Sequence, residues 1–210
     1  MNLSKMKVGS RLALGFALVL VFLVAVTVVG IFRLAQIQDR LDHVVSVNNV
    51  VTRLVIDMRN NVADRTGSLR VLTLMSDPAD MEPEFARIKE QTAKYHADLQ
   101  KLDAKFAIEA SPEEKKLLAA IKEHEAVAMP AIERASQFWL ANDAMSATRI
   151  LIKEIRPAQK KWMDALDQLG AFEDKLNQDL KVSAAEGFNS ARNFMFGMGV
   201  LAVLVSVAAA

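Results

Sequence analysis

The chain has 210 residues, a formal net charge of +1 and no cysteine, which excludes both a disulfide framework and a thiolate metal site. Glycine (8) and proline (5) are sparse, and this composition favours long helices over strands and tight turns. The near balance of acids and bases provides no basic surface of the kind that binds nucleic acid.

The N-terminal part of the chain is typical of a membrane protein. Residues 1–11 contain Lys5, Lys7 and Arg11 and no acid, and residues 12–32 contain no charge. A run of this length suffices to cross a hydrocarbon core of ~30 Å, and it exceeds the apolar region of a cleaved signal peptide, which is the alternative. The positive-inside rule then predicts a cytoplasmic N-terminus and export of the residues that follow.

A second apolar run, from Phe194 to the last residue, predicts a second transmembrane helix over residues 194–210. This run has no polar exit, so we expect the chain to be truncated within that helix and the missing part to emerge in the cytoplasm. A C-terminal anchor that ends at Ala210 is the alternative.

The segment between the two runs, residues 33–193, is predicted to be helical almost throughout. Its expected breaks are "SDPAD" at 76–80, "EASPEE" at 109–114 and "AND" at 141–143. In the second break, Ser111 is a suitable N-cap, Pro112 suits the first helical position, and Glu114 completes a capping box. The three breaks predict helices over residues 33–76, 82–108, 112–141 and 143–193.

Three of these helices carry heptad stripes, which seal one helix against others. Helices joined by short connections pack as antiparallel neighbours, so we predict an all-α, up-down-up-down four-helix bundle whose first and last helices continue into the membrane spans. The stripes are Val51, Val55, Met58, Val62, Arg65, Leu69, Leu72 in the first helix; Phe85, Ile88, Thr92, Tyr95, Leu99, Leu102, Phe106 in the second; and Thr148, Ile152, Ile155, Gln159, Trp162, Leu166, Leu169, Leu176, Leu180 in the fourth.

Arginine interrupts the first stripe. At 100° per residue, Arg65 and Asn61 fall within the apolar face, whereas Arg59, Thr66 and Arg70 line a second face of the same helix. An unpaired buried charge costs several kcal/mol. Arg65 is therefore expected to pair with a carboxylate, to reach solvent or to bind an anion; Glu125 and Glu154 are the candidate carboxylates for an internal salt bridge.

The fourth helix has a matching irregularity, because Gln159 is the polar member of its stripe and Arg156 precedes it closely. Arg65 follows Phe32 by 33 residues, and Gln159 precedes Phe194 by 35. At 1.5 Å per residue, both are expected ~50 Å from the membrane. Polar interruptions at one height on neighbouring helices indicate a binding site.

No pattern indicates an enzyme, a cofactor or a metal. The three histidines, His43, His96 and His124, fall on different predicted helices and form no i, i+4 pair. The sequence contains no Ser-His-Asp spacing, no glycine-rich phosphate loop and no HExxH motif. Solvated surface positions are the expected places for these histidines.

The order of segments resembles the N-terminal half of a bacterial methyl-accepting chemotaxis receptor. The opening "MKVGSRLALGFALVLVF" resembles the start of such receptors, and "EIRPAQKKWMDALDQL" resembles the start of their long signalling helix. The resemblance implies a periplasmic ligand-binding bundle in the inner membrane receptor, a homodimer through the first helix, and an amino acid or organic acid bound at the dimer interface. It also implies that axial displacement of the fourth helix signals to a cytoplasmic kinase-controlling region and its adaptor.

Carried over by position, the resemblance implies ligand contacts from the first helix and from "RPAQ", in which Ala158 stands where the aspartate-type receptors have threonine. The spacing of the arginines also differs from that family, which argues against aspartate itself. Arg156, an additional arginine beside the proline, indicates a more highly charged anion, so we expect a di- or tricarboxylate. A sensor histidine kinase input domain and a non-sensing membrane coiled-coil adaptor remain alternatives. The candidate site residues are Arg59, Asn61, Arg65, Thr66, Arg70, Arg156 and Gln159.

Overall fold

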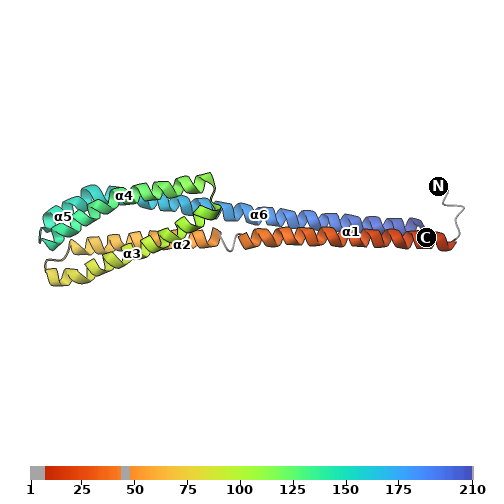
Figure 1. The fold of residues 1–210 in the computed structure, drawn as a ribbon, viewed down its shortest axis with the longest axis horizontal. Helices are drawn as coiled ribbons and strands as arrows, with labels where there is room; N and C mark the ends of the chain where they lie inside the picture. The colour runs from red at the N-terminus through yellow and green to blue at the C-terminus, as the bar shows by residue number, and fades with distance from the viewer. Residues whose placement is uncertain (1–7, 44–47, 210) are drawn as a thin grey trace. The chain divides into compact units, whose positions relative to one another are not determined.

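The computed structural model describes residues 8–43 and 48–209, and within them it contains helices and no strand. The chain divides into two compact units, Met1–Val45 with Gln178–Ala210, and Ser46–Asn177. Figure 1 identifies the elements along the chain. The helices are α1 (Val8–His43), α2 (Asn49–Leu72), α3 (Pro78–Glu109), α4 (Pro112–Leu140), α5 (Ala144–Ile150), the π-helical segment η3 (Leu151–Ile155) and α6 (Arg156–Ala209).

The first unit contains the apolar segments. One helix in the described residues is long and apolar enough to cross a membrane, over Gly15–Arg33 of α1, and it overlaps the predicted first span at residues 12–32. The second span, over residues 194–210, stays a prediction. Whether α1 continues into α2 depends on residues 44–47, which lie outside the described residues.

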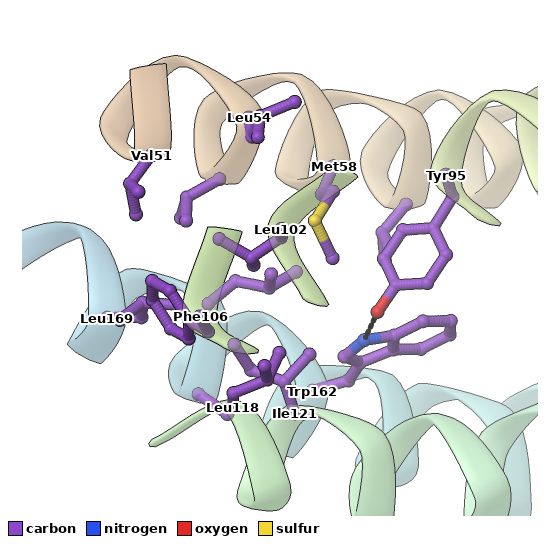
Figure 2. Close-up of a cluster of buried hydrophobic side chains, with 14 of the residues drawn as sticks. Val51, Leu54, Met58, Tyr95, Leu102, Phe106, Leu118, Ile121, Trp162 and Leu169 are labelled. Carbon is purple, nitrogen blue, oxygen red and sulfur yellow. Dashed lines mark hydrogen bonds between the residues drawn. The ribbon is translucent and has the colours of Figure 1, made fainter. Parts of the chain in front are cut away.

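The second unit is the predicted four-helix bundle. Its four helices are α2, α3, α4 and the run from α5 through η3 to the first part of α6. All four contribute to one buried cluster, with Met58 from α2, Leu102 from α3, Ile121 from α4 and Leu166 from α6. Figure 2 shows this cluster, in which the side chains of all four helices point toward one another.

A polar contact joins two helices inside this core. The indole nitrogen of Trp162 donates to the hydroxyl of Tyr95 at 3.0 Å, and the two rings meet edge to face with centroids 4.9 Å apart (Figure 2). Both residues are fully buried. Because the buried indole N–H would otherwise lack an acceptor away from water, this pair fixes the register of α3 against α6.

The ends of the helices follow local capping chemistry. The capping box at the start of α4 is confirmed, since Ser111 accepts from the Glu114 amide and Glu114 accepts from the Ser111 amide. The break at 141–143 is also confirmed: Asn142 has φ of 59°, and Asp143 caps α5. By contrast, the break expected at 76–80 lies earlier, at residues 73–77, because α2 ends at Leu72 and Asp77 caps α3, which begins at Pro78.

The stripe of the fourth bundle helix differs from the predicted one at two places. Around η3 the buried residues are Leu151 and Ile155, and Ile152 is 57 % exposed, because the wider π-turn inserts an extra residue and shifts the helix face. After Leu169, the next buried positions are Glu173 and Asn177, where the heptad had predicted Leu176 and Leu180.

Candidate functional site

A groove on the surface of the bundle unit brings together four of the seven candidate residues. Thr66 and Arg70 of α2 form one wall, and Arg156 and Gln159 of α6 belong to the other. Its volume is about 990 Å³, enough for a small organic molecule. The lining residues are Ala63, Thr66, Arg70, Leu151, Ile152, Arg156, Pro157, Gln159, Lys160 and Met163.

The charged residues that line this groove are all basic in the described part of the chain. Its described lining contains three bases, Arg70, Arg156 and Lys160, and no acid. Lys160 pairs with Asp164 at 2.8 Å, whereas Arg70 and Arg156 form no ion pair with any residue that the structure describes. Two guanidinium groups on facing helices are therefore available to an anion.

Local helix geometry places Arg156 at this groove. The π-helical segment Leu151–Ile155 ends where the Arg156 amide donates to the carbonyl of Leu151, a bond across five residues. Pro157 follows at once and has no amide hydrogen to donate. Such π-turns reorient the residues next to them, and here the turn itself contributes Leu151 and Ile152 to the groove while Arg156 and Pro157 follow directly after it.

The floor of the groove is a polar contact between α2 and α6. The side-chain amide of Gln159 donates to the backbone carbonyl of Val62 at 3.2 Å. The same carbonyl accepts the hydroxyl of Thr66 at 2.8 Å. Gln159 and Thr66 are both buried, so the contact satisfies two side chains that would otherwise lack partners.

Arg65 lies behind the groove, within the core. It is 2 % exposed, and its guanidinium carbon lies over the Trp162 ring, 4.7 Å from the centroid. One terminal nitrogen donates to Thr92 and to the Met129 sulfur, each at 3.3 Å, and the other has no partner among the described residues. Arg65 is not among the residues that line the groove.

The two carboxylates considered as salt-bridge partners of Arg65 are engaged elsewhere. Glu125 pairs with His96 at 2.7 Å, and Glu154 pairs with Arg134. Burial lowers the pKa of Arg65 to about 10, and attraction to Tyr95 and Glu125 only partly offsets it. Arg65 is therefore a buried cation stabilised by an aromatic face.

The remaining two candidates lie outside the groove. Arg59 forms an ion pair with Asp167 of α6 at a half-exposed position, which joins the same two helices nearer the other end of the bundle. Asn61 is buried and lines a separate depression between α2 and α3. The structure thus separates the seven residues into four that share the groove and three that do not.

Sequence reasoning did not identify Ile152, Pro157, Lys160 and Met163 as groove residues. The proline was visible in "RPAQ", but the π-turn that exposes Ile152 has no sequence signature that we recognised. Within the described residues, no group of three or more histidine, cysteine or acidic side chains is placed to hold a metal ion.

Compared with known protein families, residues 5–187 match the family described as a four-helix-bundle sensory module for signal transduction. The match covers both the apolar N-terminal helix and the whole bundle unit. No curated protein matches the chain significantly.

Proposed function

Since the chain belongs to the four-helix-bundle sensory modules of methyl-accepting chemotaxis proteins, we propose that its bundle binds a small organic anion and passes that signal along α6. A di- or tricarboxylate is the ligand class. The family is a signalling module and not a catalytic domain, and the groove supplies binding groups rather than a nucleophile and base.

The observation that carries this proposal is the unpaired positive charge of the groove. Arg70 and Arg156 project from facing helices, and no acid is present in the described lining. A guanidinium matches a carboxylate with two parallel hydrogen bonds. A ligand with two or more carboxylates can engage both arginines at once, whereas a monocarboxylate can satisfy only one of them in this way.

We also propose that the chain forms a homodimer through α2, next to the same site. The exposed side of α2 carries residues at steps of four and three, the spacing of a coiled-coil seam. Two of them are small, and an added Cβ at Gly67 would meet nothing within 4 Å, so a second helix can approach closely. Arg70 and Ala63 belong to both the seam and the groove. The seam residues are Ile56, Asn60, Ala63, Gly67 and Arg70.

Signalling would begin at the contact between Gln159 and the Val62 carbonyl. A carboxylate in the groove competes for the Gln159 amide, and this exchange weakens the link between α2 and α6. We propose that α6 then shifts along its axis. A difference of only ~1–3 kcal/mol between two positions of the helix suffices to bias such an equilibrium.

The topology completes the proposal. The basic N-terminus lies in the cytoplasm, the spans at 12–32 and 194–210 cross the inner membrane, and the bundle lies in the periplasm. The helix displacement reaches a cytoplasmic kinase-controlling region and its adaptor through the second span. Support comes from the family and from the apolar segment Gly15–Arg33.

A binding screen of the full chain in detergent micelles tests this function. We expect succinate, malate or citrate to raise the melting temperature of the bundle, and the effect to weaken as salt is increased. Succinamide, which has the shape of succinate without its charge, is the matched control. Equal effects of succinate and succinamide, or no effect of any organic acid, would refute the proposal.

A further inference from the structure

A second group of polar residues is buried at the opposite end of the bundle unit from the groove. Glu173 of α6 is 0 % exposed, Asn177 follows one turn later, and Glu114 lies buried in the first turn of α4. Neither carboxylate oxygen of Glu173 has a hydrogen-bond partner among the described residues, and the same holds for Oδ1 of Asn177. Three buried acceptor oxygens on neighbouring turns of α6 therefore lack a donor among the described residues.

The two carboxyl groups have different surroundings. Glu114 occupies the capping box, where its carboxylate accepts the Ser111 amide at 2.6 Å near the positive end of the α4 dipole. The carboxyl group of Glu114 therefore has a hydrogen-bond donor and a favourable helix dipole beside it. Glu173 lies in the middle of a helix and receives no such bond. Of the two carboxyl groups, Glu173 is the one without a hydrogen-bond donor among the described residues.

The charged groups that act on Glu173 strengthen this asymmetry. Burial raises the pKa of Glu173 to about 8, and the neighbouring carboxylates of Glu114 on α4 and Asp174 on α6 contribute in the same direction. No lysine, arginine or histidine is among the groups that act on it in the described part of the chain. Like charges held close together do not both ionise.

We propose that Glu173 and Glu114 form a proton-binding site inside the sensor bundle, in which Glu173 carries the proton at neutral pH and donates it in a hydrogen bond to Glu114. The bound proton turns one carboxylate oxygen of Glu173 into a donor and removes one of two adjacent buried charges. Its release in alkaline conditions would leave two repelling carboxylates between α4 and α6.

Proton binding and release at this buried site would make the bundle respond to pH. If α6 carries the signal, which rests on the proposed function, proton release biases the same helix that the organic anion acts on. Proton binding itself does not depend on that step. The two ideas can fail separately, because the acidic pair and the groove share no residue.

Infrared difference spectra of the full chain in detergent micelles, recorded through a pH titration, test the proposal. The carbonyl stretch of a protonated carboxyl group is expected to disappear between about pH 7 and 9 in the wild type and to be missing in Glu173→Gln. The matched control is Glu123→Gln, an exposed position on α4, which should keep it. A wild type whose carboxyl groups all lose their protons below pH 6, or a Glu173→Gln protein that keeps the signal, would overturn the proposal.

The variant Glu114→Gln separates the effect of the neighbouring carboxylate on the titration of Glu173 from the effect of burial. Removing the neighbouring charge should lower the titration midpoint of Glu173, while burial holds it above the ordinary value of 4.5. An unchanged midpoint would contradict a shared site.

A cation between the two carboxylates is a competing occupant, tested by adding Mg²⁺ or Ca²⁺ at pH 7. The proposal requires the infrared signal to be unaffected. Its loss at millimolar metal would assign the site to a metal ion and overturn the proposal.

Stability gives an independent readout. Glu173 binds its proton more tightly in the folded protein than in the unfolded chain, so its contribution to stability is full below pH 4.5 and is lost as the pH rises toward 8. Within that window the unfolding equilibrium constant should rise by up to tenfold per pH unit. Glu173→Gln should lack this component, and Glu123→Gln should retain it; equal slopes in the two variants would refute the site.

Discussion

The guanidinium of Arg65 lies over the indole ring of Trp162, 4.7 Å from its centroid, in the centre of the bundle. This contact explains how a heptad stripe contains an arginine: the charge faces an aromatic ring, and one terminal nitrogen reaches Thr92 and Met129. The other terminal nitrogen has no partner among the described residues. The arrangement therefore carries a desolvation cost that its contacts only partly offset.

The first prediction concerns Arg65 itself. Methionine has a comparable length and no charge, and replacing buried charges by apolar groups is often neutral or stabilising. Arg65→Met should therefore leave the free energy of unfolding unchanged or raise it. Arg65→Ala leaves a cavity and should lower it by about 2–4 kcal/mol. Thermal or chemical denaturation followed by tryptophan fluorescence measures both.

Organic-acid binding provides the second readout for these variants. Because Arg65 is not in the groove lining, both should bind within about twofold of the wild type, as long as they are folded. A loss of binding in Arg65→Met without a loss of stability would show that Arg65 contacts the ligand after all.

The second prediction concerns the buried pair of Tyr95 and Trp162. Tyr95→Phe removes the oxygen that accepts the indole N–H, and a buried donor without a partner costs about 1–3 kcal/mol. The free energy of unfolding should fall by that amount, and the Trp162 fluorescence spectrum should shift. Organic-acid affinity should not change, since neither residue lines the groove. A variant as stable as the wild type would contradict the importance of this bond.

The third prediction concerns the dimer seam on α2. Gly67→Leu places a side chain where a Cβ meets nothing within 4 Å, and it replaces a poor helix former with a good one. The monomer should gain up to ~1 kcal/mol in stability, whereas the dimer should weaken because the helices can no longer approach closely. Sedimentation equilibrium in detergent measures the monomer–dimer equilibrium of each variant.

Ala86→Leu, at an exposed position on α3, is the control for the seam. It adds a comparable side chain away from α2 and should leave the monomer–dimer equilibrium unchanged. Equal dimer affinity in Gly67→Leu and Ala86→Leu would move the interface away from the proposed seam.

The architecture was largely predictable from the sequence. The stripe from Val51 to Leu72 is buried as expected, and the Ser111–Glu114 capping box formed as its spacing indicated. Both depend on local chemistry or on a regular period, which a single sequence displays directly.

The site was only partly predictable. Gln159 was expected from the matching heights of the polar interruptions, and Arg70 and Arg156 from the family resemblance; the structure places all three at one groove. The exposure of Ile152 did not follow, because a π-turn changes the period within the helix. The burial of Glu173 did not follow either, since the heptad rule placed leucines on that face and treated a carboxylate as solvated.

The measurement that tests the central claim most directly is isothermal titration of the full chain with the tightest-binding di- or tricarboxylate. It compares the wild type with Arg70→Gln, Arg156→Gln and Arg53→Gln. Arg53 lies on α2 with a side chain that is 85 % exposed, and it is not part of the groove. A charge-assisted hydrogen bond is worth ~1.5–3 kcal/mol, so Arg70→Gln and Arg156→Gln should each weaken binding by about tenfold or more, and Arg53→Gln by less than about twofold. Wild-type affinity in both groove variants, or an equal loss in all three, would contradict an anion site between α2 and α6.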